Sequence, residues 1–451
     1  MRVGVTLGGP CRRTLRSRLH SNRLAPGRCQ GQASIGSTSL ALDQPSHLSA
    51  ARYVPRRPES RDRPTRILHV EANEDGTVGG SHRALVDLAS NMNRTRFEPV
   101  VLFFQTNRHV APLREAGIEV HCWDEVRTRE CERRARGGSR KYLDFFGAIL
   151  RRAALIRTLR IDMIHLNNSL QTGYDDWLPA ARLTGVPCIT FAMGDAVIGS
   201  RLAVIAARRF DHVIAISAYM RDAVRAAGVR EDRITLAYLG VDAPTLRSSV
   251  RSPRALKRAE MGIAASDVAV IMVGNVRAWK GQHVLVEALA LLPPDVRAPL
   301  QIRFVGAGSA VDQAYRDALD ARIAAIGATG CVRFLGGRDD VPELYAAADI
   351  AVHASVIPEP FGLVVPEAMA HGLPVIASRF GGPGEVVTPA CGRLFDPAHP
   401  EEMAGHLTEL VRDASLRRSL GDEARRQVEA FSVREMVDRI ELAYTTVLSR
   451  W

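Results

Sequence analysis

The chain has 451 residues, 46% of them hydrophobic and 24% charged, which predicts two or three globular domains with sizeable cores. It contains no run of about 18 apolar residues, so a membrane-spanning helix is not expected. The formal charge of +11 would suit a nucleic-acid-binding protein, but residues 1–65 alone hold twelve arginines, no lysine and three acids, and the remaining chain is nearly balanced, so nucleic acid is not expected as a partner.

The first 64 residues are rich in Arg, Ser, Pro and Gly and lack an apolar segment of signal-peptide length. We predict that residues 1–64 are a disordered basic tail, because this composition does not form a core. A transit peptide, or translated sequence upstream of the true start, would have a similar composition and stays an alternative. The seven cysteines of the chain form no CxxC pair, which favours reduced thiols in a cytoplasmic protein.

From Arg66 onward, short apolar segments alternate with segments of helical periodicity. Such alternation is typical of a parallel, doubly wound sheet. A turn at Gly79-Gly80 precedes a helix that we expect over residues 81–92. The strands expected in this first half cover residues 66–72, 99–104, 118–122, 163–166, 187–192, 213–216 and 234–238.

Four residues of the first half are candidates for ligand contact because they lie near the ends of expected strands, where parallel sheets bind ligands. Gly79 and Gly80 would let the backbone approach a phosphate or an acceptor. His165 is a candidate on the acceptor side and Asp195 is a candidate catalytic residue, both placed to face a cleft. For each of these two side chains, a purely structural role is the alternative.

Residues 242–253 contain two prolines, three serines and no periodicity, and we interpret them as an interdomain linker. The first domain is therefore expected over 65–245 and the second over 252–430. A last helix is expected over 431–451, with Ser432 as its N-cap. The second domain is also predicted to be Rossmann-like, with strands over residues 268–274, 302–305, 332–335, 350–353 and 374–377 and helices over residues 282–292, 311–326, 341–348 and 365–371.

Residues 358–372, which read PEPFGLVVPEAMAHG, follow an expected strand of the second domain. Pro366 suits the first turn of a helix and Gly372 suits its end. This assignment places Glu367 in the first helical turn and Glu359 in the preceding loop. The segment therefore puts two carboxylates beside the N-terminus of a helix.

That combination suits a nucleotide sugar. A helix N-terminus stabilises a diphosphate through its unpaired N–H groups and its partial positive charge, and Gly362 leaves the backbone amides accessible. Two acids would repel phosphate, but a carboxylate accepts two hydrogen bonds from a vicinal diol. One acid on a ribose and one on a sugar would bracket the diphosphate; a surface loop acid and a helix-start acid with no ligand are the alternative.

A second loop, residues 274–282 with the sequence GNVRAWKGQ, also joins a strand to a helix. Lys280 places a compact positive charge near that helix start, where it suits a phosphate. Arg277 is a second candidate cation, and a solvated loop is the alternative for both. A glycine turn at Gly306 ends another strand of the same half, which is weak evidence by itself.

At these residues the chain resembles the retaining glycosyltransferases of family 4, which have the GT-B fold. The EX7E element of that family is matched by Glu359 and Glu367, its phosphate loop by residues 274–282, and its glycine turn by Gly79-Gly80. The resemblance extends over residues 65–450.

The resemblance implies an α/β fold of GT-B architecture, in which two Rossmann-like domains face a cleft and the C-terminal helix returns to the N-terminal domain. It implies that Glu367 holds the ribose hydroxyls, Glu359 contacts the transferred sugar, and Lys280 neutralises the diphosphate leaving group. The implied donor-binding residues are Gly79, Gly80, Asn275, Arg277, Lys280, Gly306, Glu359, Phe361, Gly362, Leu363 and Glu367.

Two positions differ from the family pattern. Asn275 stands where the family often has arginine, and Arg277 is placed to compensate for it. Met193 stands near the place of a common histidine and cannot donate a hydrogen bond to a sugar, so we expect Asp195 to take over that contact or the contact to be lost.

We therefore predict a retaining, metal-independent glycosyltransferase of hexosyltransferase type. It would move a sugar from a nucleotide-diphosphate sugar, which is a co-substrate, to a glycan, lipid-linked or small-molecule acceptor in cell-surface polysaccharide or glycoconjugate synthesis. No metal-ligand cluster such as DxD occurs in the donor region, and no metal or other cofactor is expected. A nucleotide-sugar epimerase and a non-catalytic nucleotide-sugar-binding protein are the alternatives.

The basic stretch from Arg127 to Lys141 is either a solvated loop or a patch that contacts a membrane surface. We accordingly expect a cytoplasmic protein and keep open a peripheral contact at the inner face of the membrane.

Overall fold

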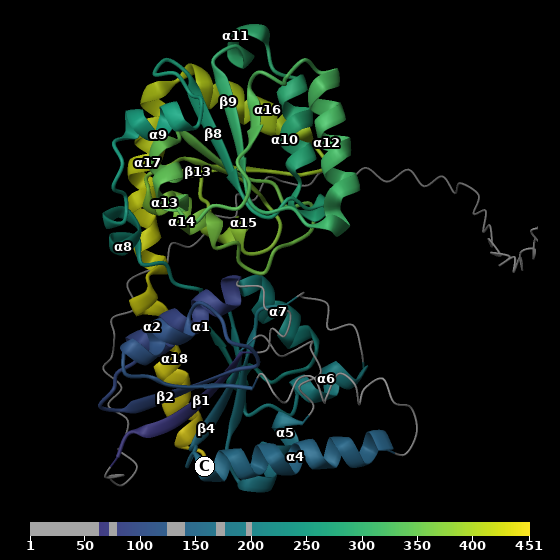
Figure 1. Ribbon diagram of the computed structural model, residues 1–451, viewed down its shortest axis with the longest axis vertical. Helices are drawn as coiled ribbons and strands as arrows, with labels where there is room; N and C mark the ends of the chain where they lie inside the picture. The colour runs from purple at the N-terminus through teal and green to yellow at the C-terminus, as the bar shows by residue number, and fades with distance from the viewer. Residues whose placement is uncertain (1–62, 72–78, 124–139, 168–175, 195–200) are drawn as a thin grey trace, which may run out of the picture. The chain divides into compact units, whose positions relative to one another are not determined.

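The computed structural model describes residues 63–71, 79–123, 140–167, 176–194 and 201–451 (Figure 1). The side chains of residues 140–143 and 201–203 are not among those described. Three predictions fall outside the described residues: the basic tail up to residue 62, the basic stretch from Arg127 to residue 139, and Asp195. The described residues all belong to one unit, residues 58–451.

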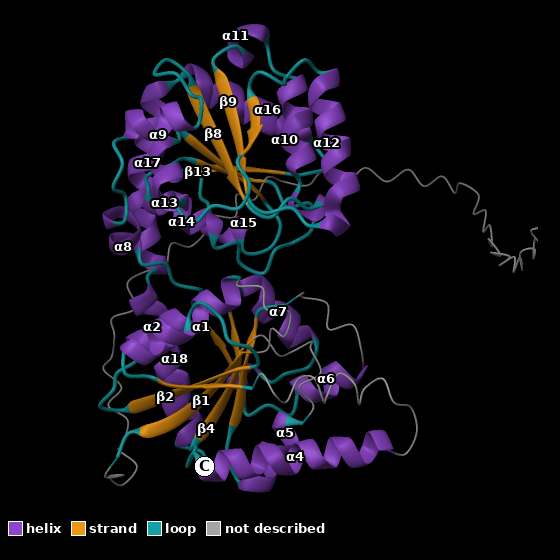
Figure 2. Cartoon of the chain, viewed as in Figure 1, coloured by secondary structure: helices purple, strands orange, loops and turns teal. Residues whose placement is uncertain are grey.

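The first sheet has seven parallel strands in the order β3-β2-β1-β4-β5-β6-β7. Its central strands are apolar runs buried on both faces, as expected where helices cover a parallel sheet on both sides (Figure 2). The strands are β1 (Thr65–Glu71), β2 (Phe97–Phe103), β3 (Glu119–Cys122), β4 (Met163–Asn167), β5 (Cys188–Ala192), β6 (His212–Ala215) and β7 (Ile234–Leu236).

The second sheet has six parallel strands in the order β10-β9-β8-β11-β12-β13. The twelve strands expected from the sequence are all present, and the edge strand β13 was missed because Gly392 and a partly exposed Arg393 interrupt its apolar pattern. The strands are β8 (Val268–Val273), β9 (Leu300–Val305), β10 (Val332–Phe334), β11 (Ile350–His353), β12 (Val375–Ser378) and β13 (Gly392–Phe395).

The α-helices connect these strands and follow the second sheet to the end of the chain. No helix in the described part is long and apolar enough to cross a bilayer. The helices are α1 (Gly80–Asn91), α2 (Val110–Glu115), α4 (Arg140–Thr158), α5 (Trp177–Thr184), α6 (Arg201–Ala207), α7 (Ala218–Ala226), α8 (Ala243–Ser248), α9 (Arg254–Glu260), α10 (Gln282–Ala290), α11 (Pro294–Arg297), α12 (Gln313–Ala325), α13 (Val341–Ala347), α14 (Val364–Ala370), α15 (Pro383–Val386), α16 (Pro400–Arg412), α17 (Ala414–Gln427) and α18 (Val433–Leu448).

The segment interpreted as an aperiodic linker contains a helix. α8 lies within residues 242–253, and the side chain of Asp242 caps it by accepting a hydrogen bond from the Thr245 N–H at 3.0 Å. Its six residues are too few for an apolar period to be recognised in the sequence.

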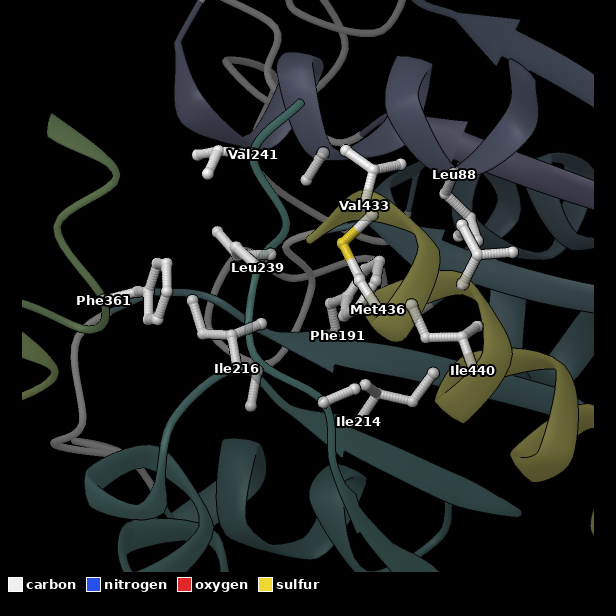
Figure 3. Packing of buried hydrophobic residues seen from close by; sticks show 14 of the residues in the cluster. Leu88, Phe191, Ile214, Ile216, Leu239, Val241, Phe361, Val433, Met436 and Ile440 are labelled. Carbon is white, nitrogen blue, oxygen red and sulfur yellow. The ribbon is translucent and has the colours of Figure 1, made fainter. Parts of the chain in front are cut away.

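The last helix, α18, packs against the first sheet, which confirms the predicted return of the C-terminal helix. Ser432 caps α18 as expected, because its hydroxyl accepts a hydrogen bond from the Glu435 N–H. Val433, Met436 and Ile440 lie among buried side chains that come from α1 and the first sheet (Figure 3).

Both sheets are doubly wound. The chain starts at an inner strand, adds strands toward one edge, and then returns to the inner strand and adds strands toward the other edge. In the second sheet the reversal lies between β8 and β11, and in the first sheet between β1 and β4. Ligands of such sheets bind beyond the carboxyl ends of the strands at this switch point. The loops after β8 and β11 are therefore the expected place for a ligand in the second sheet.

Candidate active site

The two loops at the switch point of the second sheet are held together by their backbones. Gly281 has a φ of +77°, and a Cβ there would lie 1.9 Å from the carbonyl oxygen of Ala354, so only glycine fits. The Val356 N–H donates to the carbonyl oxygen of Trp279 at 2.9 Å. This close packing brings the phosphate loop predicted at 274–282 against the loop that carries Glu359.

Lys280 and Glu359 meet as a result. Lys280 Nζ lies 2.8 Å from Glu359 Oε1, and both side chains are 15% exposed. Lys280 Nζ also lies 4.3 Å from the ring centroid of Trp279, a cation–π contact that limits where the ammonium group can go. The structure therefore brings together the two residues to which the sequence assigned the leaving group and the sugar.

The second carboxylate oxygen of Glu359 has two further donors. His353 Nε2 lies 2.7 Å from Oε2, and the Ser355 hydroxyl donates to the same oxygen at 2.9 Å. Burial raises the pKa of the Glu359 carboxyl, but the charges and hydrogen bonds of His353 and Lys280 outweigh burial and hold the pKa well below its usual range. Glu359 is therefore ionised at neutral pH.

Glu367 has a different environment. It lies in the first turn of the seven-residue helix α14, which begins at Val364, and it is partly buried. Burial raises the pKa of Glu367 to about 7, Arg83 opposes this rise, and Asp87 adds to it. Arg83 and Asp87 both belong to α1, so the carboxyl faces that helix. The predicted end of α14 is confirmed, since Gly372 follows it with a φ of +75°.

Residues 361–363 connect Glu359 to α14. Gly362 has a φ of +77°, and a Cβ there would lie 3.0 Å from Pro383 Cγ, so glycine is required. Phe361 is 2% exposed and its ring packs against Tyr238 and Phe431. Only its backbone is therefore available for contact with a nucleotide sugar. Leu363 is the N-cap residue of α14 and is partly exposed.

The glycine turn of the first half approaches this segment. Gly79 and Gly80 are exposed at the start of α1, and a Cβ on Gly80 would lie 3.3 Å from Leu363 Cδ1. The structure thus brings Gly80 next to the segment that carries Gly362 and Leu363.

The remaining candidates for contact with the nucleotide sugar in the second half lie in or near the phosphate loop. The carbonyl oxygen of Arg277 accepts a hydrogen bond from the Lys280 N–H at 2.9 Å, but the side chains of Asn275 and Arg277 form no hydrogen bond with Lys280 or Glu359 in the described structure. A Cβ on Gly306 would lie 2.1 Å from the carbonyl oxygen of Gly274, so these two strand ends touch. Asn275 is exposed, and its carbonyl oxygen accepts a hydrogen bond from Gln282 Nε2 at 3.0 Å. Arg277 is exposed, and its Nε lies 3.5 Å from Asp312 Oδ2.

The prediction that His165 faces a cleft is wrong. His165 is the third residue of β4 and 1% exposed, and its Nδ1 lies 2.6 Å from the hydroxyl of Tyr444 in α18. Burial lowers the pKa of this imidazole well below its usual value. The side chain at this register points to the face of the sheet that α18 covers, whereas the loop beyond the strand starts only after Asn167.

Met193 follows β5 directly, where the sequence placed it, and packs against the buried core of the first sheet. Asp195, expected to replace the missing histidine, lies outside the described residues.

Sequence reasoning missed His353 and Ser355. His353 ends β11 and was counted only as part of the strand. A polar residue at the carboxyl end of a buried strand next to the switch point is the signal that could have identified it. Within the described residues, no group of three or more His, Cys, Asp or Glu side chains is arranged to hold a metal ion.

Two family models match the chain. The model described as Glycosyltransferase Family 4 matches residues 78–244, and the model described as Glycosyl transferases group 1 matches residues 253–427.

Named relatives and solved structures agree with these models. The D-inositol 3-phosphate glycosyltransferase of Rhodococcus jostii is 33% identical over 225 residues, 49% of this chain and 49% of the relative, so the chain spans about half its length. The protein of the same name from Saccharomonospora viridis is 30% identical over 66% of this chain and 72% of the relative. The crystal structure of Anabaena Alr3699/HepE in complex with UDP-glucose has a TM-score of 0.69 and 26% identity, over 84% of this chain and 99% of that chain. With its two doubly wound sheets and returning C-terminal helix, the chain therefore belongs to glycosyltransferase family 4 and has the GT-B fold.

Proposed function

We propose that the chain is a retaining, metal-independent glycosyltransferase that moves a hexose from a nucleotide-diphosphate sugar to an acceptor hydroxyl. The observation that carries this proposal is the Lys280–Glu359 pair, 2.8 Å apart at the switch point, with Glu367 on the helix that follows. A cation for the leaving group and two carboxylates for hydroxyl groups are then available on two adjoining loops.

In this proposal the diphosphate lies between the two carboxylates, against Lys280 and the backbone amides near Gly362. Cleavage of the bond between the sugar and the phosphate leaves negative charge on the diphosphate, and Lys280 stabilises that charge in the transition state. Glu359 accepts hydrogen bonds from hydroxyls of the transferred sugar, and Glu367 accepts them from the ribose.

We infer a uridine nucleotide as donor. The support is the Anabaena protein, which is 26% identical to this chain and whose structures contain UDP, UDP with glucose, and UDP-glucose. A phosphorylated polyol, a glycan and a lipid-linked sugar stay open as acceptors; the first is suggested by the names of the curated relatives.

A two-stage assay tests the function. A thermal-shift screen of nucleoside diphosphates and their sugars identifies the donor, and a ligand at 100 times its dissociation constant stabilises a protein by about 2.7 kcal/mol. The release of nucleoside diphosphate is then measured with and without the acceptor classes. We expect donor-dependent release that an acceptor accelerates. Isomerisation of the sugar without an acceptor would identify an epimerase, and binding without any turnover would identify a non-catalytic protein.

We also propose that the protein is cytoplasmic with a peripheral membrane contact through α4. Phe146 and Leu150 lie one turn apart on this helix and are 61% and 62% exposed, and Arg151 and Arg157 lie on the same helix. Apolar and basic side chains on one helix suit an anionic lipid surface. Wild type should sediment with vesicles that contain anionic phospholipid, and the F146S/L150S double variant should not; equal sedimentation of the two proteins would remove α4 from the contact.

A further inference from the structure

Three side chains surround the Glu359 carboxylate, and its two oxygens have different partners. Oε1 of Glu359 faces Lys280, whereas Oε2 receives hydrogen bonds from His353 and Ser355. The Ser355 hydroxyl also lies 3.2 Å from His353 Nε2. Each carboxylate oxygen therefore has its own set of partners.

The partners at the two ends differ in their freedom to move. Lys280 reaches Glu359 with a long flexible side chain from the end of a short 3-10 turn, residues 278–280. His353 is the last residue of the buried strand β11 and is 4% exposed, and Ser355 is 1% exposed. A diphosphate can draw Lys280 away from Glu359, but it cannot draw the other two.

If Lys280 moved away and nothing replaced it, the largely buried Glu359 carboxylate would lack hydrogen-bond donors, which costs free energy. The two hydrogen-bond donors at Oε2, His353 and Ser355, avoid this cost. They also fix the rotation of the carboxylate, so that Oε1 is the oxygen left open to a sugar hydroxyl.

His353 suits this role through both of its ring nitrogens. Its Nε2 must carry a hydrogen to donate to Glu359, while its Nδ1 is buried and has no hydrogen-bond partner among the described residues. Nε2 is therefore the ring nitrogen that orients the carboxylate, and within the described residues no second hydrogen bond at Nδ1 competes for the direction of the ring.

We propose that His353, assisted by Ser355, is a positioning residue: it keeps the Glu359 carboxylate ionised and oriented toward the donor sugar while Lys280 moves from Glu359 to the diphosphate. This inference rests on the proposed function. It assigns His353 a part in sugar transfer rather than in nucleotide binding, because its Nε2 contacts are with Glu359 and Ser355. Gly362 lies beside the ring, where a Cβ would be 3.5 Å from His353 Nε2, but in the described structure it forms no hydrogen bond with His353.

The test separates the rate from nucleotide affinity in three variants and one control. His353→Ala removes the first hydrogen-bond donor to Glu359 Oε2, and Ser355→Ala removes the second. His353→Gln retains an N–H group of similar reach. His212→Gln is the matched control, because His212 is also a buried strand histidine with a hydrogen bond at Nε2, to Thr235 at 2.8 Å, and an unpartnered Nδ1.

We expect His353→Ala to lower kcat about 10²-fold, as small losses of orientation do, with an unchanged dissociation constant for UDP. His353→Gln should recover most of the rate, Ser355→Ala should lose less than His353→Ala, and His212→Gln should match wild type. The acid limb of the pH–rate profile should move to higher pH in His353→Ala. Of the two groups that lower the pKa of Glu359, His353 and Lys280, only Lys280 would remain.

Wild-type turnover in His353→Ala, or a loss of UDP affinity as large as the loss of rate, would overturn the inference. If His353→Ala does not fold, Ser355→Ala and an H353Q/S355A double variant decide. A wild-type rate and a wild-type acid limb in both of them would equally overturn the inference. A wild type that binds UDP but cleaves no nucleotide sugar would instead sink the proposed function, and the inference with it.

Discussion

Lys280 is paired with Glu359 in this structure, yet the proposed reaction needs its charge on the diphosphate. Lys280→Ala should therefore lower kcat by about 10²–10³-fold, because the charge that it stabilises develops fully only in the transition state. Donor affinity should change much less. Glu367→Ala is the contrasting variant, since a ribose contact is similar in both states and its loss should raise the donor dissociation constant with little effect on kcat. Equal losses of rate and affinity in both variants would contradict these separate roles.

Because the pKa of Glu367 is raised to about 7, we expect UDP binding to depend on pH in the neutral range. An ionised carboxylate accepts ribose hydroxyls better than a protonated one, so binding should lower this pKa and release a proton. UDP affinity should rise as pH increases through about 7, and calorimetry in buffers of different ionisation enthalpy should detect the proton. Glu367→Gln is the control for titration of UDP itself; the same pH dependence in that variant would exclude Glu367 as the titrating group.

The sequence was sufficient to place Lys280 in a strand–helix loop, Glu359 in the loop before α14 and Glu367 in its first turn, because their spacing and the adjoining glycines mark strand–loop–helix units. The roles assigned to them stay predictions. The sequence was insufficient for His353 and Ser355, whose importance depends on where the Glu359 carboxylate turns. His165 was assigned wrongly because a difference of two residues along β4 decides between the buried face of a sheet and its open edge.

At the scale of elements, α15 caps a helix of the first half. Both carboxylate oxygens of Glu385 accept hydrogen bonds, from the backbone N–H groups of Ala218 and Tyr219 in the first turn of α7, each at 2.7 Å. Glu385→Ala should lower stability by about 1–2 kcal/mol, as the loss of a charged cap does. Thermal unfolding measures this, with the exposed Asp438→Asn as control; equal midpoints would mean that the cap does not contribute.

Elements with a clear period were predictable and isolated ones were not. The strands of both sheets are apolar runs between turn residues, and each could be placed to within a few residues. β13 was missed because Gly392 and the partly exposed Arg393 interrupt its apolar pattern, and α8 was missed because six residues give no helical period to recognise. The cap by Glu385 joins residues more than 160 positions apart, so no local pattern could reveal it.

At the scale of the whole molecule, α18 fixes the end of the chain to the first sheet. Ile440 is fully buried there and lies beside residues of that sheet (Figure 3). Ile440→Ala should cost about 2–5 kcal/mol through lost burial and the cavity left behind. Chemical denaturation measures the loss, with the exposed Leu442→Ala of the same helix as control. Equal effects of the two substitutions would contradict a specific role for the buried face of α18.

In the proposed reaction Lys280 stabilises the leaving diphosphate without a metal ion. This is tested by the rate of UDP release from the preferred donor, measured on wild type in excess chelator and again with added magnesium. We expect the same rate in both conditions. Turnover that chelation abolishes and magnesium restores would contradict it, and the role assigned to Lys280 would have to be given up.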